Sequence, residues 1–175
     1  MTISRILILC TGNLCRSPMA AALLRQRLRD ATVRSAGLCA AVGEPAASEV
    51  VGLLALRGID VSMHRAIQVT RSMCGEADLI LVMTRAQQRS LHDVFPQTRG
   101  KAFLLSDGDD VADPFGHSAE QFCACLDQVS DGIEQWARRI ESERAASLSA
   151  TRISTEYPPR GSHHATEALQ ERIWR

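Results

Sequence analysis

The fold is decided by residues 5–18, which read RILILCTGNLCRSP. The apolar run in residues 5–9 is short and uninterrupted, which is typical of a strand buried on both faces of a sheet. Residues 11–13 are polar or flexible and interrupt the strand. Ser17 is a favoured helix cap and Pro18 suits the first helical position, so a helix is expected to begin here. The segment therefore predicts a strand, a loop and a helix in immediate succession.

The same alternation continues along the chain. Further strands are expected at residues 32–36, 78–83 and 101–105, and helices at residues 17–29, 46–57, 84–95 and 118–143. Strands that alternate with helices indicate a single α/β domain, here a four-stranded parallel sheet flanked by helices with right-handed crossovers. Ligands bind such sheets beyond the carboxyl ends of the strands. The loop after the first strand lies at such an end.

Composition limits the class of protein. The 175 residues include 20 basic and 20 acidic side chains, so the formal net charge is zero, and nucleic acid or an anionic membrane surface is not an expected partner. Six cysteines are too few for a disulfide scaffold in a chain of this length and favour a cytoplasmic protein with free thiols. We find no signal peptide and no apolar stretch of about 18 residues, so no membrane insertion is expected.

The composition changes near residue 145. The segment that follows is rich in small and polar residues, and Tyr157-Pro158-Pro159 disfavours a helix. We therefore expect the folded domain at residues 1–144 and a disordered or loosely docked tail at residues 145–175.

The loop of residues 10–16 begins with Cys10 and ends with Arg16. This spacing alone is a weak signal, but a buried strand precedes it, a helix start follows it, and Gly12 and Asn13 tolerate left-handed backbone geometry. Backbone N–H groups turned inward, together with the helix N-terminus, would form a cradle for an anion. The predicted phosphate-binding residues are Thr11, Gly12, Asn13, Leu14, Cys15, Arg16 and Ser17.

Within this cradle Cys10 is the candidate nucleophile. The amide dipoles, Arg16 and the Ser17 hydroxyl would favour its thiolate form, and the Arg16 guanidinium matches two phosphate oxygens. Attack on a bound phosphate would produce a phosphocysteine intermediate. Asp113 is the candidate general acid and then base, with Pro114 limiting the conformations of its loop.

No metal or other cofactor is expected. Cys123 and Cys125 are two positions apart on a predicted helix, so they point to different faces, and no second ligand pair lies nearby in the sequence.

The combination of CTGNLCRSP at residues 10–18, Ser35-Ala36-Gly37, and Asp113-Pro114 resembles the low-molecular-weight protein tyrosine phosphatases of bacteria. The resemblance covers residues 4–143 and implies metal-free hydrolysis of phosphotyrosine on proteins. It also implies that Asn13 holds the shape of the loop with help from Ser35 and His64. Cys15, by the same resemblance, could form a reversible disulfide with Cys10 under peroxide.

Residues 37–43 resemble those of family members associated with exopolysaccharide or capsule production. The partner of those proteins is an autophosphorylating tyrosine kinase. Two positions depart from the family: Phe115 replaces a frequent tyrosine, and Ala41 replaces a larger apolar residue. Both positions flank the cleft in the family, so the resemblance leaves the substrate walls open.

Two alternative functions use the same loop. An arsenate reductase would need further thiols after the strand at residues 78–83, yet residues 84–122 contain no cysteine. A non-catalytic phosphotyrosine-binding module would be favoured if Cys10, Arg16 or Asp113 were missing, and all three are present.

Overall fold

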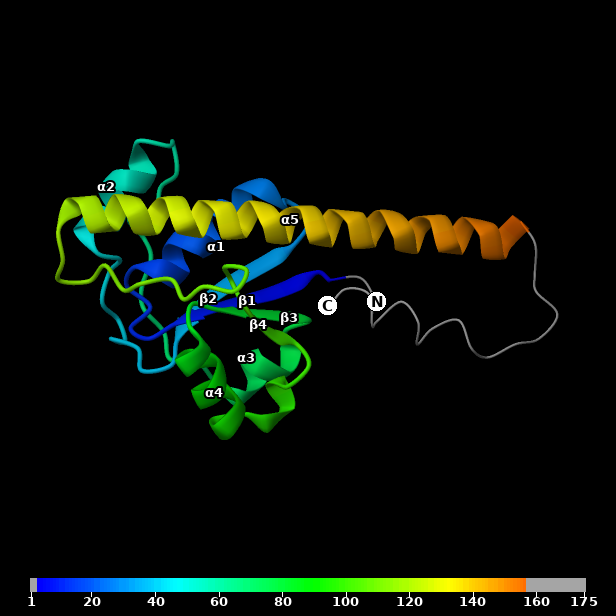
Figure 1. Ribbon diagram of the computed structural model, residues 1–175, viewed down its shortest axis with the longest axis horizontal. Coiled ribbons are helices and arrows are strands. Elements are labelled where there is room, and N and C mark those ends of the chain that lie inside the picture. Colours follow the sequence, from blue (N-terminus) through cyan, green and yellow to red (C-terminus); the bar gives the residue numbers. More distant parts are fainter. Residues whose placement is uncertain (1–2, 157–175) are drawn as a thin grey trace. The chain divides into compact units, whose positions relative to one another are not determined.

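The computed structural model describes residues 3–156, with side chains through residue 147, and shows a sheet flanked by helices (Figure 1). The elements in chain order are β1 (Arg5–Cys10), α1 (Arg16–Arg27), β2 (Thr32–Gly37), α2 (Ser48–Ala55), α3 (Arg71–Glu76), β3 (Leu79–Val82), α4 (Arg85–Val94), the 3-10 helix η1 (Pro96–Thr98), β4 (Ala102–Leu104) and α5 (Ala119–Glu156). The chain divides into a compact unit of residues 3–137 and a second unit that includes the chain from Arg138 onward. The first unit contains the sheet and every predicted site residue.

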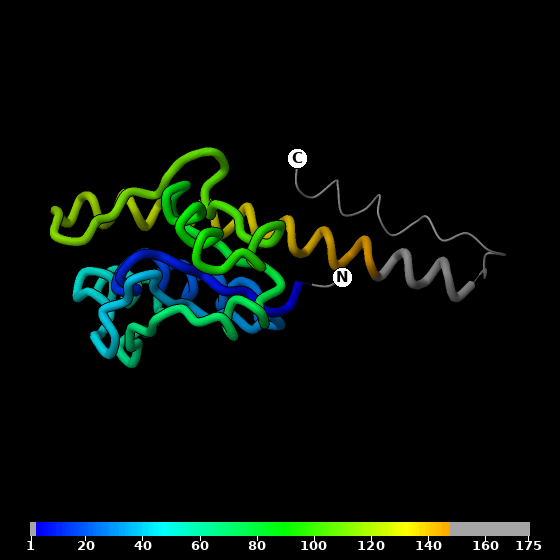
Figure 2. The backbone as a smooth tube through the Cα atoms, turned by 90° about the horizontal axis from the view of Figure 1, so that it is seen from below, coloured from blue at the N-terminus to red at the C-terminus, as the bar shows by residue number. Residues whose placement is uncertain are grey.

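The four strands form one parallel sheet in the order β2-β1-β3-β4. The predicted α/β architecture is therefore confirmed. Because the strands are parallel, their carboxyl ends lie along one edge, where Cys10 at the end of β1 pairs with Gly37 at the end of β2. Figures 1 and 2 both show the segments around residues 38–47 and 106–118 at this edge, beside the loop that follows β1.

Side chains alternate across the central strand β1 and anchor it on both faces. Leu7 and Leu9 belong to a buried cluster shared with α3 and α4. Ile6 and Ile8 point to the opposite face, on the side where Figure 1 shows α1, and both are at most 2% exposed. Burial of each such side chain contributes roughly 1.5–3 kcal/mol. The strand therefore holds Cys10 at a fixed position at its end.

The start of α1 differs from the prediction. The helix begins at Arg16, its N-cap residue Cys15 makes no side-chain cap bond, and Ser17 lies inside the first turn. The prediction that Ser17 caps the helix is therefore wrong. Its hydroxyl instead lies 2.9 Å from the Cys10 sulfur, so the loop rather than the helix end uses this side chain.

Two other helices also differ from the prediction. The six-residue helix α3 was not expected, and it begins where Thr70 Oγ1 accepts a hydrogen bond from Met73 N at 3.2 Å. Helix α2 is shorter than predicted, since it covers Ser48–Ala55 and not residues 46–57. The start of α4 is as predicted, with Thr84 Oγ1 accepting from Gln87 N at 3.1 Å. Short helices such as α3 leave little periodicity in a sequence.

Helix α5 is longer than predicted, because it continues to Glu156 where we expected an end at Glu143. Alanine, arginine and leucine in residues 145–156 are good helix formers, and composition alone underestimates them. The expected tail is therefore helical in residues 145–156, and its remainder, residues 157–175, lies outside the described residues. No described helix combines the length and the apolar character needed to cross a membrane.

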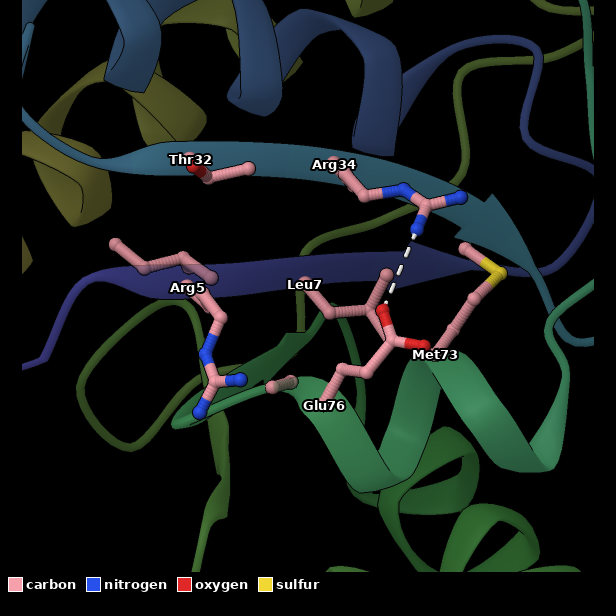
Figure 3. A pocket seen from close by; sticks show the side chains of 8 residues that line it. Arg5, Leu7, Thr32, Arg34, Met73 and Glu76 are labelled. Atoms are coloured by element: carbon pink, nitrogen blue, oxygen red, sulfur yellow. Dashed lines mark ion pairs between the residues drawn. The ribbon is translucent and has the colours of Figure 1, made fainter.

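Part of the sheet face between β2 and α3 is open. A groove of about 110 Å³ lies there, lined by Arg5, Leu7, Thr32, Arg34, Met73 and Glu76 among others (Figure 3). An ion pair between Arg34 and Glu76 at 3.8 Å crosses it from β2 to α3. Arg5 pairs with Asp78 at 2.7 Å. The polar side chains Thr32 and Arg34 of β2 therefore line the part of the sheet face that α3 does not cover.

The close contact between α5 and the end of β4 requires a glycine at position 132, and this can be tested. A Cβ at Gly132 would lie 2.7 Å from the carbonyl oxygen of Leu105, whereas a Cβ at Gly52 in α2 would meet no atom within 4 Å. We expect Gly132→Ala to lower the free energy of unfolding by about 1–3 kcal/mol. Gly52→Ala should raise it by about 0.5–1 kcal/mol. Urea denaturation of both variants measures this, and equal stabilities would contradict the close packing.

Candidate active site

The loop between β1 and α1 bonds its carbonyl groups to segments that surround it. Four of these carbonyls accept from backbone N–H groups: Cys10 O from Leu38 N at 2.9 Å, Thr11 O from Cys39 N at 3.0 Å, Gly12 O from Ala41 N at 3.1 Å, and Leu14 O from Ala47 N at 3.0 Å. The carbonyl of Asn13 contacts the His64 ring nitrogen Nε2 at 2.8 Å. Each partner lies outside the loop, so these carbonyls face away from its centre.

This bonding determines the direction of the amide groups. The chain has no cis peptide in its described part, and in a trans peptide the C=O and the following N–H point in opposite directions. Carbonyls that face outward from residues 10–14 therefore place the N–H groups of residues 11–15 on the inner side. Asn13 N shows this directly, because it donates to the Cys10 sulfur at 3.3 Å. Inward amides around a cysteine form the predicted anion cradle.

Gly37 allows β2 to approach this loop. A Cβ at Gly37 would lie 2.5 Å from the carbonyl oxygen of Thr11 and 2.9 Å from atoms of Ala40. Any larger residue would push the strand away from the loop. The glycine of the Ser35-Ala36-Gly37 segment is therefore required by close backbone contact.

Asn13 is the centre of the loop's hydrogen-bond network. Its φ of 60° is in the left-handed region, and its side chain is fully buried. Its Nδ2 donates to Ser17 Oγ at 2.9 Å and to Ser35 Oγ at 3.1 Å, and its Oδ1 accepts from Ile67 N at 3.0 Å. In addition, the backbone carbonyl of Asn13 contacts His64 Nε2. The structure thus brings the predicted supporting residues Ser35 and His64 to Asn13.

His64 binds this loop as a neutral ring. Burial lowers the pKa of His64, and it outweighs the hydrogen bond to the Asn13 carbonyl, which acts in the opposite direction. Because a carbonyl can only accept, the Nε2 atom must carry the proton that it donates.

The Cys10 sulfur has two hydrogen-bond partners within the loop and the first turn of α1. Asn13 N donates to it at 3.3 Å, and the Ser17 hydroxyl lies 2.9 Å away. The Ser17 oxygen also accepts from Asn13 Nδ2, so the three groups are linked. Cys10 is 2% exposed. A sulfur held by donors at the centre of inward amides is suited to act as a nucleophile.

One guanidinium nitrogen of Arg16 has no hydrogen-bond partner among the described residues. Arg16 is 4% exposed, its Nη1 donates to Val111 O at 3.0 Å, and its Nη2 pairs with the Asp113 carboxylate. Its Nε atom is buried and has no partner among the described residues. An unsatisfied buried donor costs about 1–3 kcal/mol, and an anionic oxygen could accept this bond.

Asp113 lies 97 residues after Arg16 in the chain and contacts it in the fold. Its side chain is 48% exposed and contacts Arg16, and Phe115 N donates to its Oδ1 at 3.3 Å. Pro114 is buried, while Phe115 is 59% exposed. The structure therefore brings together Cys10, Arg16 and Asp113, the three residues predicted to be catalytic.

The second thiol of the loop, Cys15, differs from Cys10. Burial, and next the negative charge of Asp113, raises the pKa of Cys15 to about 12, so its thiol is protonated at neutral pH. All six cysteines are free thiols in this structure. The disulfide between Cys10 and Cys15 stays a prediction. Among residues 3–147, no group of three or more histidine, cysteine or acidic side chains could hold a metal ion.

One buried contact to the loop was not predicted. Gln87 of α4 donates from Nε2 to Thr11 Oγ1 at 3.0 Å, and its Oε1 accepts from Met83 N at 2.9 Å. The sequence contains one signal for a special role, since Thr84 and Gln87 have the spacing of a capping box.

Comparison with known proteins identifies the family. Residues 5–146 match the model described as low molecular weight phosphotyrosine protein phosphatase. A probable low molecular weight protein-tyrosine-phosphatase, EpsP of Ralstonia nicotianae, is 43% identical over 142 residues, which cover 80% of this chain and 98% of the relative. A protein-arginine-phosphatase of Geobacillus stearothermophilus is 37% identical over 147 residues, which cover 80% of this chain and 98% of the relative.

A solved structure is similar over the same region. Wzb of Vibrio vulnificus in complex with benzylphosphonate aligns with a TM-score of 0.76 and 31% identity, covering 78% of this chain and 99% of that one. The loop of Cys10 and Arg16 and the contact of Arg16 with Asp113 therefore occur here on a matching fold. The chain belongs to the low molecular weight phosphotyrosine protein phosphatase family.

Proposed function

We propose that this protein is a protein-tyrosine-phosphatase that hydrolyses phosphotyrosine through a phosphocysteine intermediate. The observation that carries the proposal is the buried Arg16 Nε without a partner among the described residues, beside a cradle in which Asn13 N and the Ser17 hydroxyl contact the Cys10 sulfur. The names of the relatives support the same activity. We further propose that residues 1–144 form the catalytic domain.

Binding of the substrate phosphate would rearrange one ion pair. The phosphate oxygens accept from the inward amides and from Arg16, and they compete with Asp113 for the guanidinium. Substrate binding would thereby free the Asp113 carboxyl group from Arg16, so that it can face the leaving oxygen.

The reaction would proceed in two displacements. The Cys10 sulfur attacks phosphorus while the bond to the tyrosine oxygen breaks, and Asp113 gives its proton to that oxygen. Arg16 and the amides stabilise the equatorial oxygens. In the second step Asp113 takes a proton from water, the water oxygen attacks phosphorus, and the bond to Cys10 breaks to release phosphate.

The substrate is proposed to be phosphotyrosine on a protein, and the finer proposal is an autophosphorylating tyrosine kinase of exopolysaccharide production. Support for the kinase comes from the resemblance of residues 37–43 to family members associated with that process. A cytoplasmic location agrees with such a partner. No observation favours arsenate reduction or a non-catalytic binding role.

Three substitutions test the chemistry on a simple aryl phosphate in the presence of EDTA. Cys10→Ser should abolish turnover, and Asp113→Ala should lower kcat by about 10²–10⁴ because the leaving oxygen loses its proton source. Arg16→Lys should cost about 10²-fold or more, since lysine lacks the planar fork. Cys123→Ser, an exposed thiol on α5, is the control. Near-normal activity of Arg16→Lys would contradict the proposal.

The Asn13 network should determine phosphate affinity. Asn13→Ala removes three side-chain bonds and places an alanine at a φ of 60°. Ser35→Ala removes only one bond. We expect Asn13→Ala to weaken binding of vanadate by more than about tenfold and Ser35→Ala by a smaller factor. The competitive inhibition constants measure this, and the opposite order would be inconsistent with the network.

The substrate class is tested by comparing peptides. We expect kcat/KM to be higher on a phosphotyrosine peptide than on a phosphoarginine peptide of the same sequence. No arsenate reduction is expected with thioredoxin present, since residues 84–122 contain no cysteine. A preference for phosphoarginine would instead place the activity with that of the Geobacillus stearothermophilus relative.

A further inference from the structure

The general acid proposed above lies on a loop that needs external support. Asp113 belongs to the segment between β4 and α5, and its side chain is about half exposed. The nearest fixed point is Val111, which is fully buried, donates from its N to Met83 O at 2.8 Å and accepts from Arg16 Nη1. One fixed residue would still allow the loop to pivot.

A second fixed point lies just before Val111. Asp110 Oδ1 accepts from Arg85 N at 2.8 Å, and Arg85 Nη2 donates to Gly108 O at 2.5 Å. The Asp110 carbonyl also accepts from Gln128 Nε2 at 3.3 Å. We call the paired contacts of Arg85 with Asp110 and Gly108 the acid-loop latch. Asp113 lies only three residues after Asp110.

The latch is anchored on the same helical turn that contacts the phosphate loop. Arg85 is the first residue of α4, and Gln87 in the same turn donates to Thr11 Oγ1 at 3.0 Å. Thr11 directly follows Cys10. One turn of α4 therefore contacts both the loop that holds the nucleophile and the loop that holds the acid.

We infer that Asp110 and Arg85 are positioning residues, which hold the loop of Asp113 at the distance from Cys10 that proton transfer to the leaving group requires. The inference rests on the proposed function. Neither residue touches the reacting atoms; they act through the backbone of residues 108–111. Loss of the latch should leave phosphate binding intact, because the bonds that shape residues 10–14 do not involve Arg85 or Asp110, and Val111, which binds Arg16, is held separately by Met83.

If Asp110 only stabilised the structure, a different result would be expected. A carboxylate that binds the first N–H of α4 stabilises that helix, and its removal would then lower stability without a preference for any substrate. The two roles separate when the leaving group varies. A misplaced acid slows expulsion of a poor leaving group, whereas dinitrophenolate leaves without a proton.

The first experiment compares Asp110→Ala with Asp109→Ala. Both remove one negative charge from the same loop, and Asp109 is exposed with no hydrogen bond or ion pair in the described structure. We measure kcat/KM on phenyl phosphate and on 2,4-dinitrophenyl phosphate, together with the inhibition constant of vanadate. Urea denaturation of each variant records stability.

We expect Asp110→Ala to lose about tenfold in kcat/KM on phenyl phosphate and less than about twofold on 2,4-dinitrophenyl phosphate, with vanadate binding unchanged. Asp109→Ala should match the wild type on both substrates. Asp110→Asn keeps the acceptor oxygen and should restore most of the loss. Arg85→Ala removes the Gly108 contact but keeps the backbone N–H that binds Asp110, so it should show the same substrate dependence with a smaller loss. Arg89→Ala, on the same helix, should show none.

Two results would overturn the inference: equal losses on both substrates for Asp110→Ala, or identical behaviour of Asp110→Ala and Asp109→Ala. Failure of the proposed function looks different, because the wild type itself would then hydrolyse neither aryl phosphate.

Discussion

The site depends on one constraint, which is that the carbonyl groups of the loop after β1 are bonded outward. Four backbone amides, from Leu38, Cys39, Ala41 and Ala47, and one histidine ring hold those oxygens. The amides on the opposite side are thereby directed toward the Cys10 sulfur without any charged residue in that part of the loop. Peptide geometry therefore contributes positive potential to the cradle in addition to that of Arg16, and these amides are already oriented before an anion enters.

A second contact joins the two halves of the site. Arg16 binds both the Val111 carbonyl and the Asp113 carboxylate, so one side chain belongs to the phosphate cradle and to the acid loop. In the reaction proposed above, an arriving phosphate would compete for this arginine and release the carboxyl group in the same event. The ion pair would then link substrate binding to the freeing of the proposed acid.

Residues 5–18 predict the strand, the loop and the helix because burial and capping tendencies are local. Local rules also explain the errors: Ser17 has the chemistry of a cap, but the thiol seven residues earlier uses its hydroxyl. The gathering of Ser35 and His64 at Asn13 came from the resemblance, since those positions lie 22 and 51 residues away. Contacts such as Gln87 with Thr11 leave almost no trace in the sequence, because an amide side chain on a helix has many possible partners.

The distances along the chain within the site have a consequence for biosynthesis. Asn13 accepts a hydrogen bond from Ile67, which is synthesised 54 residues later, and Arg16 pairs with Asp113, which is synthesised 97 residues later. Parallel sheets with such long-range contacts close late in folding, because the entropy of large loops must be overcome first. During synthesis Cys10 is therefore present long before the residues that surround it in the folded protein, and the site is complete only after the second half of the sheet has formed.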